Sequence, residues 1–214
     1  MATRADGLLV SIDGPGGVGK TTTIEHLTTM LGRAGLSVHR TAQPSTGPIG
    51  AMARDLVPTA GGAALACLFA ADRYHQLDNE IHPHRAAGHI VLCDRYLASG
   101  LVVQHADGLD LAFLAGINAH ADPPDLAVIL TADPDTIARR VAARGVHNRY
   151  QGGTAQAAAE ITHYSQAATL LLHAGAAVLR IDTTHNPPNR VAVMIAAELG
   201  SIRRAAPATP SRAA

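Results

Sequence analysis

The chain has 214 residues, of which 47% are hydrophobic, and its 17 basic and 17 acidic side chains give a formal net charge of zero. Zero net charge removes the electrostatic case for binding long nucleic acid, so the expected ligand is small. No apolar run approaches the roughly 20 residues of a membrane-spanning helix, and the N-terminus lacks the apolar segment of a signal peptide, which favours a cytoplasmic protein.

The first predicted element is a strand over residues 7–13, an apolar run of strand length. A glycine-rich segment follows over residues 14–21, and a helix is expected over residues 21–34. Apolar runs then alternate with helical patterns along the rest of the chain. The further strands are predicted at residues 37–41, 90–93, 126–130 and 177–181, and the further helices at residues 63–84, 109–119, 134–143, 157–173 and 189–199.

Nearly unbroken apolar strands separated by helices predict an α/β fold, with a five-stranded parallel sheet covered by helices on both faces. Ligands of such sheets bind at the carboxyl ends of the strands. One domain is expected over residues 1–200, followed by a disordered tail over residues 201–214 that is rich in Ala, Pro, Ser and Arg. Cys67 and Cys93 lack metal-ligand spacing, so both are expected to be small core residues.

The segment between the first strand and the first helix matches G-x-x-x-x-G-K-[ST], the P-loop pattern that binds nucleotide phosphates. Its lysine, Lys20, is the only lysine of the chain. A compact ammonium group can reach between the β- and γ-phosphates, a task for which a planar guanidinium is less suited. Thr21 is expected to offer its hydroxyl to Mg²⁺. The residues expected to bind ATP are Gly14, Pro15, Gly16, Gly17, Val18, Gly19, Lys20, Thr21 and Thr22.

Charged residues after the P-loop indicate a second phosphate site. Asp94 ends an apolar strand, where a carboxylate can bind Mg²⁺ or its waters, with a salt bridge or helix cap as the alternative. Arg95 follows directly, Arg73 lies in the long helix, and Arg144 and Arg149 flank a polar, glycine-containing stretch. Donor and acceptor phosphates repel each other unless cations lie between them, so these arginines favour phosphoryl transfer.

Five motifs in this order resemble those of thymidylate kinases, P-loop enzymes that transfer the γ-phosphate of ATP to a nucleoside monophosphate. The motifs are Asp13-Gly14 at the start of the P-loop, residues 43–50 around a proline, residues 68–73, Asp94-Arg95-Tyr96 followed by Ser99 and Gln104, and residues 143–149. The resemblance covers about residues 7–199. It implies the P-loop NTPase fold with a short lid over the nucleotides.

The resemblance also implies roles for single residues. Phe69 should stack on the acceptor base, Arg73 should donate to a base carbonyl, and Arg95 should hold the acceptor phosphate. For Phe69, the alternative is an aromatic side chain in the core. Gln104 should face the base or its surroundings. The acceptor-site residues implied are Phe69, Arg73, Asp94, Arg95, Ser99 and Gln104, and the catalytic residues implied are Lys20, Arg95, Arg144 and Arg149, of which either lid arginine should close over the transferring phosphoryl group.

The chain departs from the family mainly on the acceptor side. Gly16 stands where many members have a carboxylate that binds the sugar 3′-hydroxyl, and Gln43 stands where glutamate usually precedes proline. Gly100 and Val103 replace residues that can hydrogen-bond, and Asn148 replaces a lid aspartate. A site without hydrogen-bonding groups at the sugar discriminates weakly between acceptors that differ in their sugar hydroxyls. Sugar-modified acceptors are therefore expected to be tolerated.

The expected activity is Mg²⁺- and ATP-dependent phosphorylation of a nucleoside monophosphate, with dTMP as the expected acceptor. Two alternatives stay open: a kinase for a different small acceptor, such as another nucleotide, a nucleoside or a specialised metabolite, and a nucleotide-binding regulatory module. The apolar helix over residues 63–84 is compatible with a homodimer. The spacing of His75, His82, His84 and His89 favours solvated side chains over a metal site.

Overall fold

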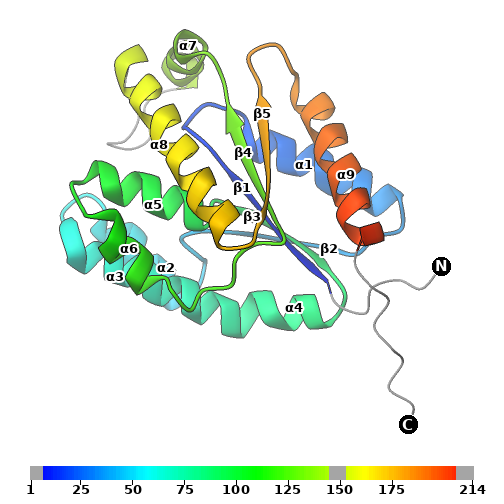
Figure 1. Cartoon of the computed structure of the whole chain (residues 1–214), viewed down its shortest axis with the longest axis horizontal. Helices are drawn as coiled ribbons and strands as arrows, with labels where there is room; N and C mark the ends of the chain where they lie inside the picture. The colour runs from blue at the N-terminus through cyan, green and yellow to red at the C-terminus, as the bar shows by residue number, and fades with distance from the viewer. Residues whose placement is uncertain (1–6, 145–152, 206–214) are drawn as a thin grey trace.

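The computed structural model describes residues 7–144 and 153–205, which form a five-stranded parallel sheet flanked by helices (Figure 1). The order of the strands across the sheet is β2-β3-β1-β4-β5, and each neighbouring pair is parallel. The predicted α/β class and parallel sheet are therefore confirmed. The strands are β1 (Leu8–Asp13), β2 (Val38–Ala42), β3 (Ile90–Asp94), β4 (Leu126–Thr131) and β5 (Ala177–Asp182).

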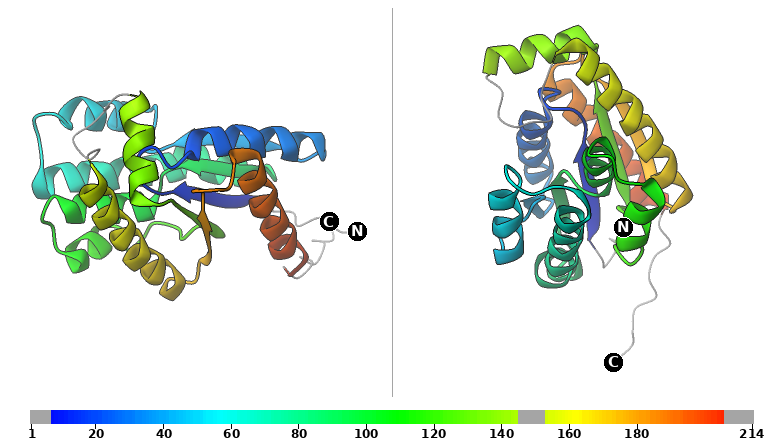
Figure 2. Two further views of the ribbon diagram at one scale, coloured as in Figure 1. Left: turned by 90° about the horizontal axis from the view of Figure 1, so that it is seen from above. Right: turned by 90° about the vertical axis from the view of Figure 1, so that its left-hand side faces the viewer.

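Helices cover both faces of this sheet, as the turned views in Figure 2 also show. α1 (Lys20–Arg33) and α9 (Pro188–Ala205) pack against each other on one face. The other face is covered by α3 (Gly62–Gln76), α5 (Leu97–Ala106) and α8 (Thr154–His173). The remaining helical elements are α2 (Pro48–Leu56), the π-helical turn η1 (Leu77–Ile81), α4 (His82–Ala86), α6 (Leu111–Ile117) and α7 (Pro134–Arg144).

The central strands are apolar on both sides because each of their faces is buried. In β1, Val10 belongs to the core beneath α1 and α9, whereas its neighbour Leu9 belongs to the core beneath α3 and α5. Alternation along β4 places Val128 and Ile129 in the same two cores. Full burial of such a side chain stabilises the fold by about 1.5–3 kcal/mol. Burial on both faces explains why these strands read as continuous apolar runs.

Two helices near the site were not predicted from the sequence, namely α2 and α5. α5 starts three residues after β3, and its sequence LASGLVVQHA contains Gly and two β-branched valines, which lower helix propensity. It is also buried on several sides, which removes the apolar stripe of a surface helix. The helix predicted at residues 63–84 corresponds to α3, η1 and α4 in succession.

The C-terminal helix is longer than predicted. α9 continues to Ala205, so residues 201–205 are helical rather than part of a disordered tail, and residues 206–214 lie outside the described part of the chain. No helix in the described ranges is both long and apolar enough to cross a membrane.

Some expected side-chain environments also differ. Cys93 is buried, as predicted, but Cys67 is exposed on α3. His84 and His89 are partly exposed, and their Nδ1 atoms lie 2.9 Å apart. The His84 ring also stacks on the His39 ring, with 3.5 Å between the ring centroids. These side chains connect β2 with α4 and with the segment that follows it.

Candidate active site

The P-loop links the end of β1 to the start of α1. Gly14 has φ of 147°, and a Cβ atom there would lie 2.3 Å from the carbonyl oxygen of Leu130, so only glycine fits this turn. α1 begins at Lys20 with no side-chain cap, which leaves its first N–H groups free for an anion. Thr22 is exposed in the first turn of this helix. The predicted strand, loop and helix thus form a phosphate-binding cradle.

Lys20 is held at the centre of this loop. Its Nζ atom donates to the carbonyl oxygens of Gly14, at 2.8 Å, and Pro15, at 2.9 Å. An ammonium group has three donors, so one remains for a phosphate oxygen. Burial lowers the pKa of Lys20 to about 7, and the positive charge of Arg95 acts in the same direction. The site therefore disfavours a buried cation until negative charge arrives.

Thr21 and Asp94 meet across the end of the sheet. The Thr21 hydroxyl donates to Oδ2 of Asp94 at 2.9 Å, and both residues are at least partly accessible. A hydroxyl and a carboxylate are oxygen ligands of the type that Mg²⁺ prefers, with phosphates and waters completing its shell. No group of three or more His, Cys, Asp or Glu side chains suited to a metal occurs in the described ranges. The pair fits a metal ion held jointly with a nucleotide.

Asp13 fixes the segment after β3 beside the P-loop. Its Oδ1 atom accepts hydrogen bonds from the backbone N–H groups of Tyr96, at 2.9 Å, and Ser99, at 3.0 Å. Arg95, which directly precedes Tyr96, has φ of 71°, which is uncommon for a residue with a side chain. The free energy of two hydrogen bonds to a buried carboxylate exceeds the free-energy cost of moderate backbone strain. The Asp13 contacts thus hold Arg95 in a conformation that its own preference disfavours.

The Arg95 guanidinium lies between the P-loop and α8. Its Nη1 atom is 3.4 Å from the Gly14 carbonyl oxygen, 3.3 Å from Ser99 Oγ and 3.4 Å from the hydroxyl of Tyr164. Ser99 Oγ and the Tyr164 hydroxyl are themselves 3.0 Å apart. This arrangement places a fixed cation next to Lys20, as the transfer of a phosphoryl group requires.

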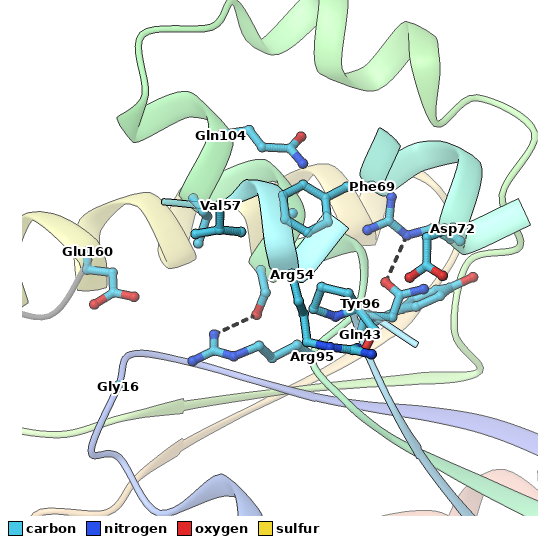
Figure 3. Close-up of a pocket in the computed structure, with 15 residues that line it drawn as sticks. Gly16, Gln43, Arg54, Val57, Phe69, Asp72, Arg95, Tyr96, Gln104 and Glu160 are labelled. Atoms are coloured by element: carbon cyan, nitrogen blue, oxygen red, sulfur yellow. Dashed lines mark hydrogen bonds between the residues drawn. The ribbon is translucent and has the colours of Figure 1, made fainter. Parts of the chain in front are cut away.

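A cavity of about 400 Å³ opens beside Arg95, and Figure 3 shows its lining. Phe69 from α3 and Gln104 from α5 both line it, and Phe69 is only half-buried, so it is not an ordinary core aromatic. Gly16 of the P-loop lies in the same lining. The cavity therefore joins an aromatic surface to the phosphate-binding loop, with a volume in the range of small-molecule sites.

Arg73 forms one wall of this cavity and is only 3% exposed. Its Nε atom donates to Gln43 Oε1 at 3.1 Å, its Nη1 atom donates to Asn118 Oδ1, and its Cζ atom lies 5.5 Å from the centre of the Tyr96 ring. Its Nη2 atom lies beside Gly100. The space left by the missing side chain at Gly100 is therefore occupied by the guanidinium.

Glu160 is a functional candidate that the sequence analysis missed. It lies on α8 and lines the cavity together with Gly16 and Arg95 (Figure 3). Burial raises the pKa of Glu160, although the charges of Lys20 and Arg95 act in the opposite direction. A carboxylate absent from the P-loop is thus supplied to the same cavity from a distant helix. The only sequence signal was one acidic residue in a predicted helix.

A second cavity, of about 450 Å³, lies on the other side of the P-loop. It is bounded by the P-loop, by Arg140 of α7 and by the segment after β5. Arg140 donates to the hydroxyl of Thr183 at 3.2 Å and to its carbonyl oxygen at 3.0 Å, which fixes the guanidinium against that segment. Two cavities therefore flank one phosphate-binding loop.

The structure brings most of the predicted site residues together. The P-loop, Asp94, Arg95 and Ser99 lie at one end of the sheet, and Phe69, Arg73 and Gln104 line the adjoining cavity. The predicted lid is the exception. Arg149 lies outside the described residues, and Arg144 is described only as the last backbone position of α7.

Comparison with known proteins agrees with this geometry. A family model described as thymidylate kinase matches residues 12–194. Similar curated proteins include a probable thymidylate kinase of Pyrobaculum aerophilum, 37% identical over 145 residues, which cover 66% of this chain and 73% of that protein. The probable thymidylate kinase of Caldivirga maquilingensis is 33% identical over 151 residues, or 69% of this chain and 74% of that protein.

A further relative is bacterial. The thymidylate kinase of Xanthomonas oryzae pv. oryzae is 40% identical over 144 residues, which cover 66% of this chain and 63% of that protein. The family match spans both the P-loop and the cavity-lining residues of α3 and α5. On this evidence the chain belongs to the thymidylate kinase family.

Proposed function

We propose that this protein transfers the γ-phosphate of ATP to dTMP and releases ADP and dTDP. The observation that carries the proposal is the shared lining of the acceptor cavity, in which Gly16 of the P-loop and Arg95 lie with Phe69 and Arg73. A nucleoside monophosphate bound there has its base against the aromatic side chain and its phosphate toward the P-loop. Family membership supports the same reaction.

The donor nucleotide is assigned to the P-loop and the second cavity. The P-loop holds the phosphates of ATP, and the cavity beside Arg140 and Thr183 receives the adenosine. Thr21 and Asp94 are the residues that would hold Mg²⁺, and the bound ion would neutralise charge on the phosphate oxygens. Lys20 and Arg95 then contribute fixed positive charge from the two sides of the transferring group.

The acceptor is held by residues from several elements. We assign base stacking to Phe69, hydrogen bonding to the base to Arg73 and Gln104, and the acceptor phosphate to Arg95. Direct in-line transfer needs no covalent enzyme intermediate, so the protein acts by positioning and charge neutralisation. Arg144 and Arg149 complete the proposal as arginines that cover the transferring phosphoryl group.

The two alternatives from the sequence are less well supported. The similar curated proteins carry the name thymidylate kinase, which favours neither a different acceptor nor a regulatory module. A regulatory switch would also have no use for the acceptor cavity, which is lined by buried Arg73 beside the phosphate-binding loop.

The test is ADP release measured in a coupled assay with ATP and Mg²⁺ over a panel of nucleotides and nucleosides. The expected result is turnover that depends on dTMP and exceeds turnover with every other acceptor. A different preferred acceptor would overturn the assignment of dTMP. Slow ATP hydrolysis that no acceptor accelerates would favour the regulatory module.

A further inference from the structure

A chain of three hydrogen bonds connects Arg73 with a carboxylate outside the acceptor cavity. Arg73 Nε donates to Gln43 Oε1 at 3.1 Å, and Gln43 Nε2 donates to Gln76 Oε1 at 3.0 Å. Gln76 Nε2 in turn donates to Glu80 Oε2 at 3.0 Å. Gln43 and Arg73 line the cavity, but Gln76 and Glu80 do not. We call this chain the glutamine relay.

The two ends of the glutamine relay determine its direction. An ionised carboxylate only accepts hydrogen bonds and a guanidinium only donates them. Gln76 must therefore present its amide nitrogen to Glu80, which turns its oxygen toward Gln43. Gln43 must then present its nitrogen to Gln76, so its oxygen faces Arg73. The Ala42 carbonyl oxygen, 3.1 Å from Gln76 Nε2, supports the same orientation.

The glutamine relay also connects the buried positive charge of Arg73 with a negative charge. No carboxylate of residues 7–144 and 153–205 forms an ion pair with this guanidinium, although it is 3% exposed. The guanidinium instead donates to the neutral oxygens of Gln43 and Asn118 and lies over the Tyr96 ring. A buried cation without a paired carboxylate is costly, and polarised hydrogen-bond chains strengthen such neutral partners. Glu80 is the acidic end of such a chain.

Glu80 is itself held in its charged form. His39 Nε2 lies 2.8 Å from its other oxygen, Oε1. Burial acts to raise the pKa of Glu80, but hydrogen bonds from His39, Thr41 and Gln76 more than offset it and lower the pKa. The carboxylate is therefore anchored by β2 on one side and by the relay on the other.

We propose that Glu80 is a positioning residue for the acceptor site, which orients the Arg73 guanidinium toward the acceptor base through Gln76 and Gln43. The inference rests on the proposed function, because it takes Arg73 as the group that binds the base. Glu80 does not touch the substrate. Glu80 should affect the binding of the acceptor and not of ATP, because none of the four side chains of the glutamine relay lines the cavity beside Arg140.

The experiment compares steady-state kinetics of full-length variants with dTMP and with ATP. Glu80→Gln removes the charge and lets the relay reverse, so the KM for dTMP should rise about tenfold while the KM for ATP stays within about twofold. Gln76→Met interrupts the relay but keeps the contact between His39 and Glu80. It should give the same selective rise in the KM for dTMP.

Two further variants supply the control and the rescue. Asp78→Asn removes a carboxylate of the same helical turn whose side chain is 77% exposed, and it should leave both KM values unchanged. Gln43→Glu in the Glu80→Gln background places a carboxylate directly against Arg73 and should lower the KM for dTMP again. Rescue by a charge at a different position distinguishes positioning from a purely structural role.

The outcomes separate the two proposals. Unchanged KM values for dTMP in both Glu80→Gln and Gln76→Met would overturn the relay, even if the wild-type protein phosphorylates dTMP rapidly. Equal increases in the KM for ATP and for dTMP would also overturn it, because they indicate general loosening of the fold. Absence of dTMP-dependent turnover in the wild type would instead overturn the proposed function, and the relay as a device for that function with it.

Discussion

Gly100 and Arg73 lie so close that a Cβ atom at Gly100 would be 2.9 Å from Nη2 of Arg73. This is shorter than real side chains tolerate, so the guanidinium takes the space that a larger residue at position 100 would fill. The guanidinium of Arg73 on α3 thus packs against Gly100 on α5, where a side chain is missing. Under the proposed function, we expect acceptor recognition to depend on this contact, because Arg73 is the group assigned to the base.

Replacing Gly100 by alanine should weaken acceptor binding selectively. The new methyl group must displace Arg73, so the KM for dTMP should rise about tenfold while the KM for ATP is unchanged. Gly116→Ala is the matched control, because a Cβ atom there meets nothing within 4 Å and alanine favours the helix. Steady-state kinetics of both variants check the prediction, and a Gly100→Ala protein with wild-type KM for dTMP would contradict it.

Lys20→Ala should abolish phosphoryl transfer without unfolding the protein. Removal of a preorganised charge at the transferring phosphate costs about 100-fold or more in kcat. Coupled ADP release gives the rate, and circular dichroism shows whether the fold persists. Turnover within about threefold of the wild type would contradict the assigned role of the P-loop lysine.

The lowered pKa of Lys20 predicts that ATP binding takes up a proton. In the nucleotide-free protein the pKa is about 7, so at pH 8 most Lys20 side chains are neutral. Phosphate charge favours the ammonium form and raises this pKa, so a proton must bind. Calorimetry at pH 8 in buffers of different ionisation enthalpy measures the uptake.

The Lys20→Ala variant is the control for that measurement and should show no proton uptake.

The lowered pKa of Lys20 also affects the stability of the protein. The unfolded lysine binds more protons than the folded one between about pH 7 and 10.5, so the free energy of unfolding of the free protein should increase with pH across this window. If the wild type took up no proton on binding ATP, the lowered pKa of Lys20 would be contradicted.

Arg95→Ala and Arg95→Gly should both impair use of the acceptor but differ in stability. Loss of charge-assisted hydrogen bonds of about 1.5–3 kcal/mol should raise the KM for dTMP and lower kcat, while the Kd for ATP changes little. Because φ is 71° at this position, glycine should give the higher Tm of the two. If the main effect were on ATP affinity, donor and acceptor sites would be wrongly assigned.

Glu160 bears on the selectivity for the acceptor sugar. From the sequence, Gly16, Gly100 and Val103 predict weak discrimination, but the structure adds the Glu160 carboxylate to the same cavity. We expect the wild type to prefer dTMP over its 3′-deoxy analogue, because a carboxylate left unpaired disfavours that analogue. Glu160→Gln should reduce this preference. The measured quantity is the ratio of kcat/KM for dTMP to kcat/KM for the 3′-deoxy analogue. The same ratio in the wild type and in Glu160→Gln would contradict a role for Glu160 at the sugar.

Features formed by neighbouring residues could be predicted from the sequence. The P-loop with Lys20 and Thr21 is contiguous, so its glycines, its charge and its place between a strand and a helix are all readable in one short segment. The central strands β1, β3 and β4 are likewise readable, because burial on both faces favours apolar residues along the strand. Asp94 and Arg95 follow one of these strands and therefore lie at its carboxyl end.

Other features depend on residues that meet only after folding. The contact of Arg73 with Gly100, the glutamine relay to Glu80 and the approach of Glu160 to Gly16 each join separate helices or loops. Their geometry follows from the strand order and from how α3, α5 and α8 pack, and these depend on the whole core rather than on any local pattern. The sequence alone determined the phosphate-binding chemistry, whereas tertiary packing decided which side chains surround the acceptor.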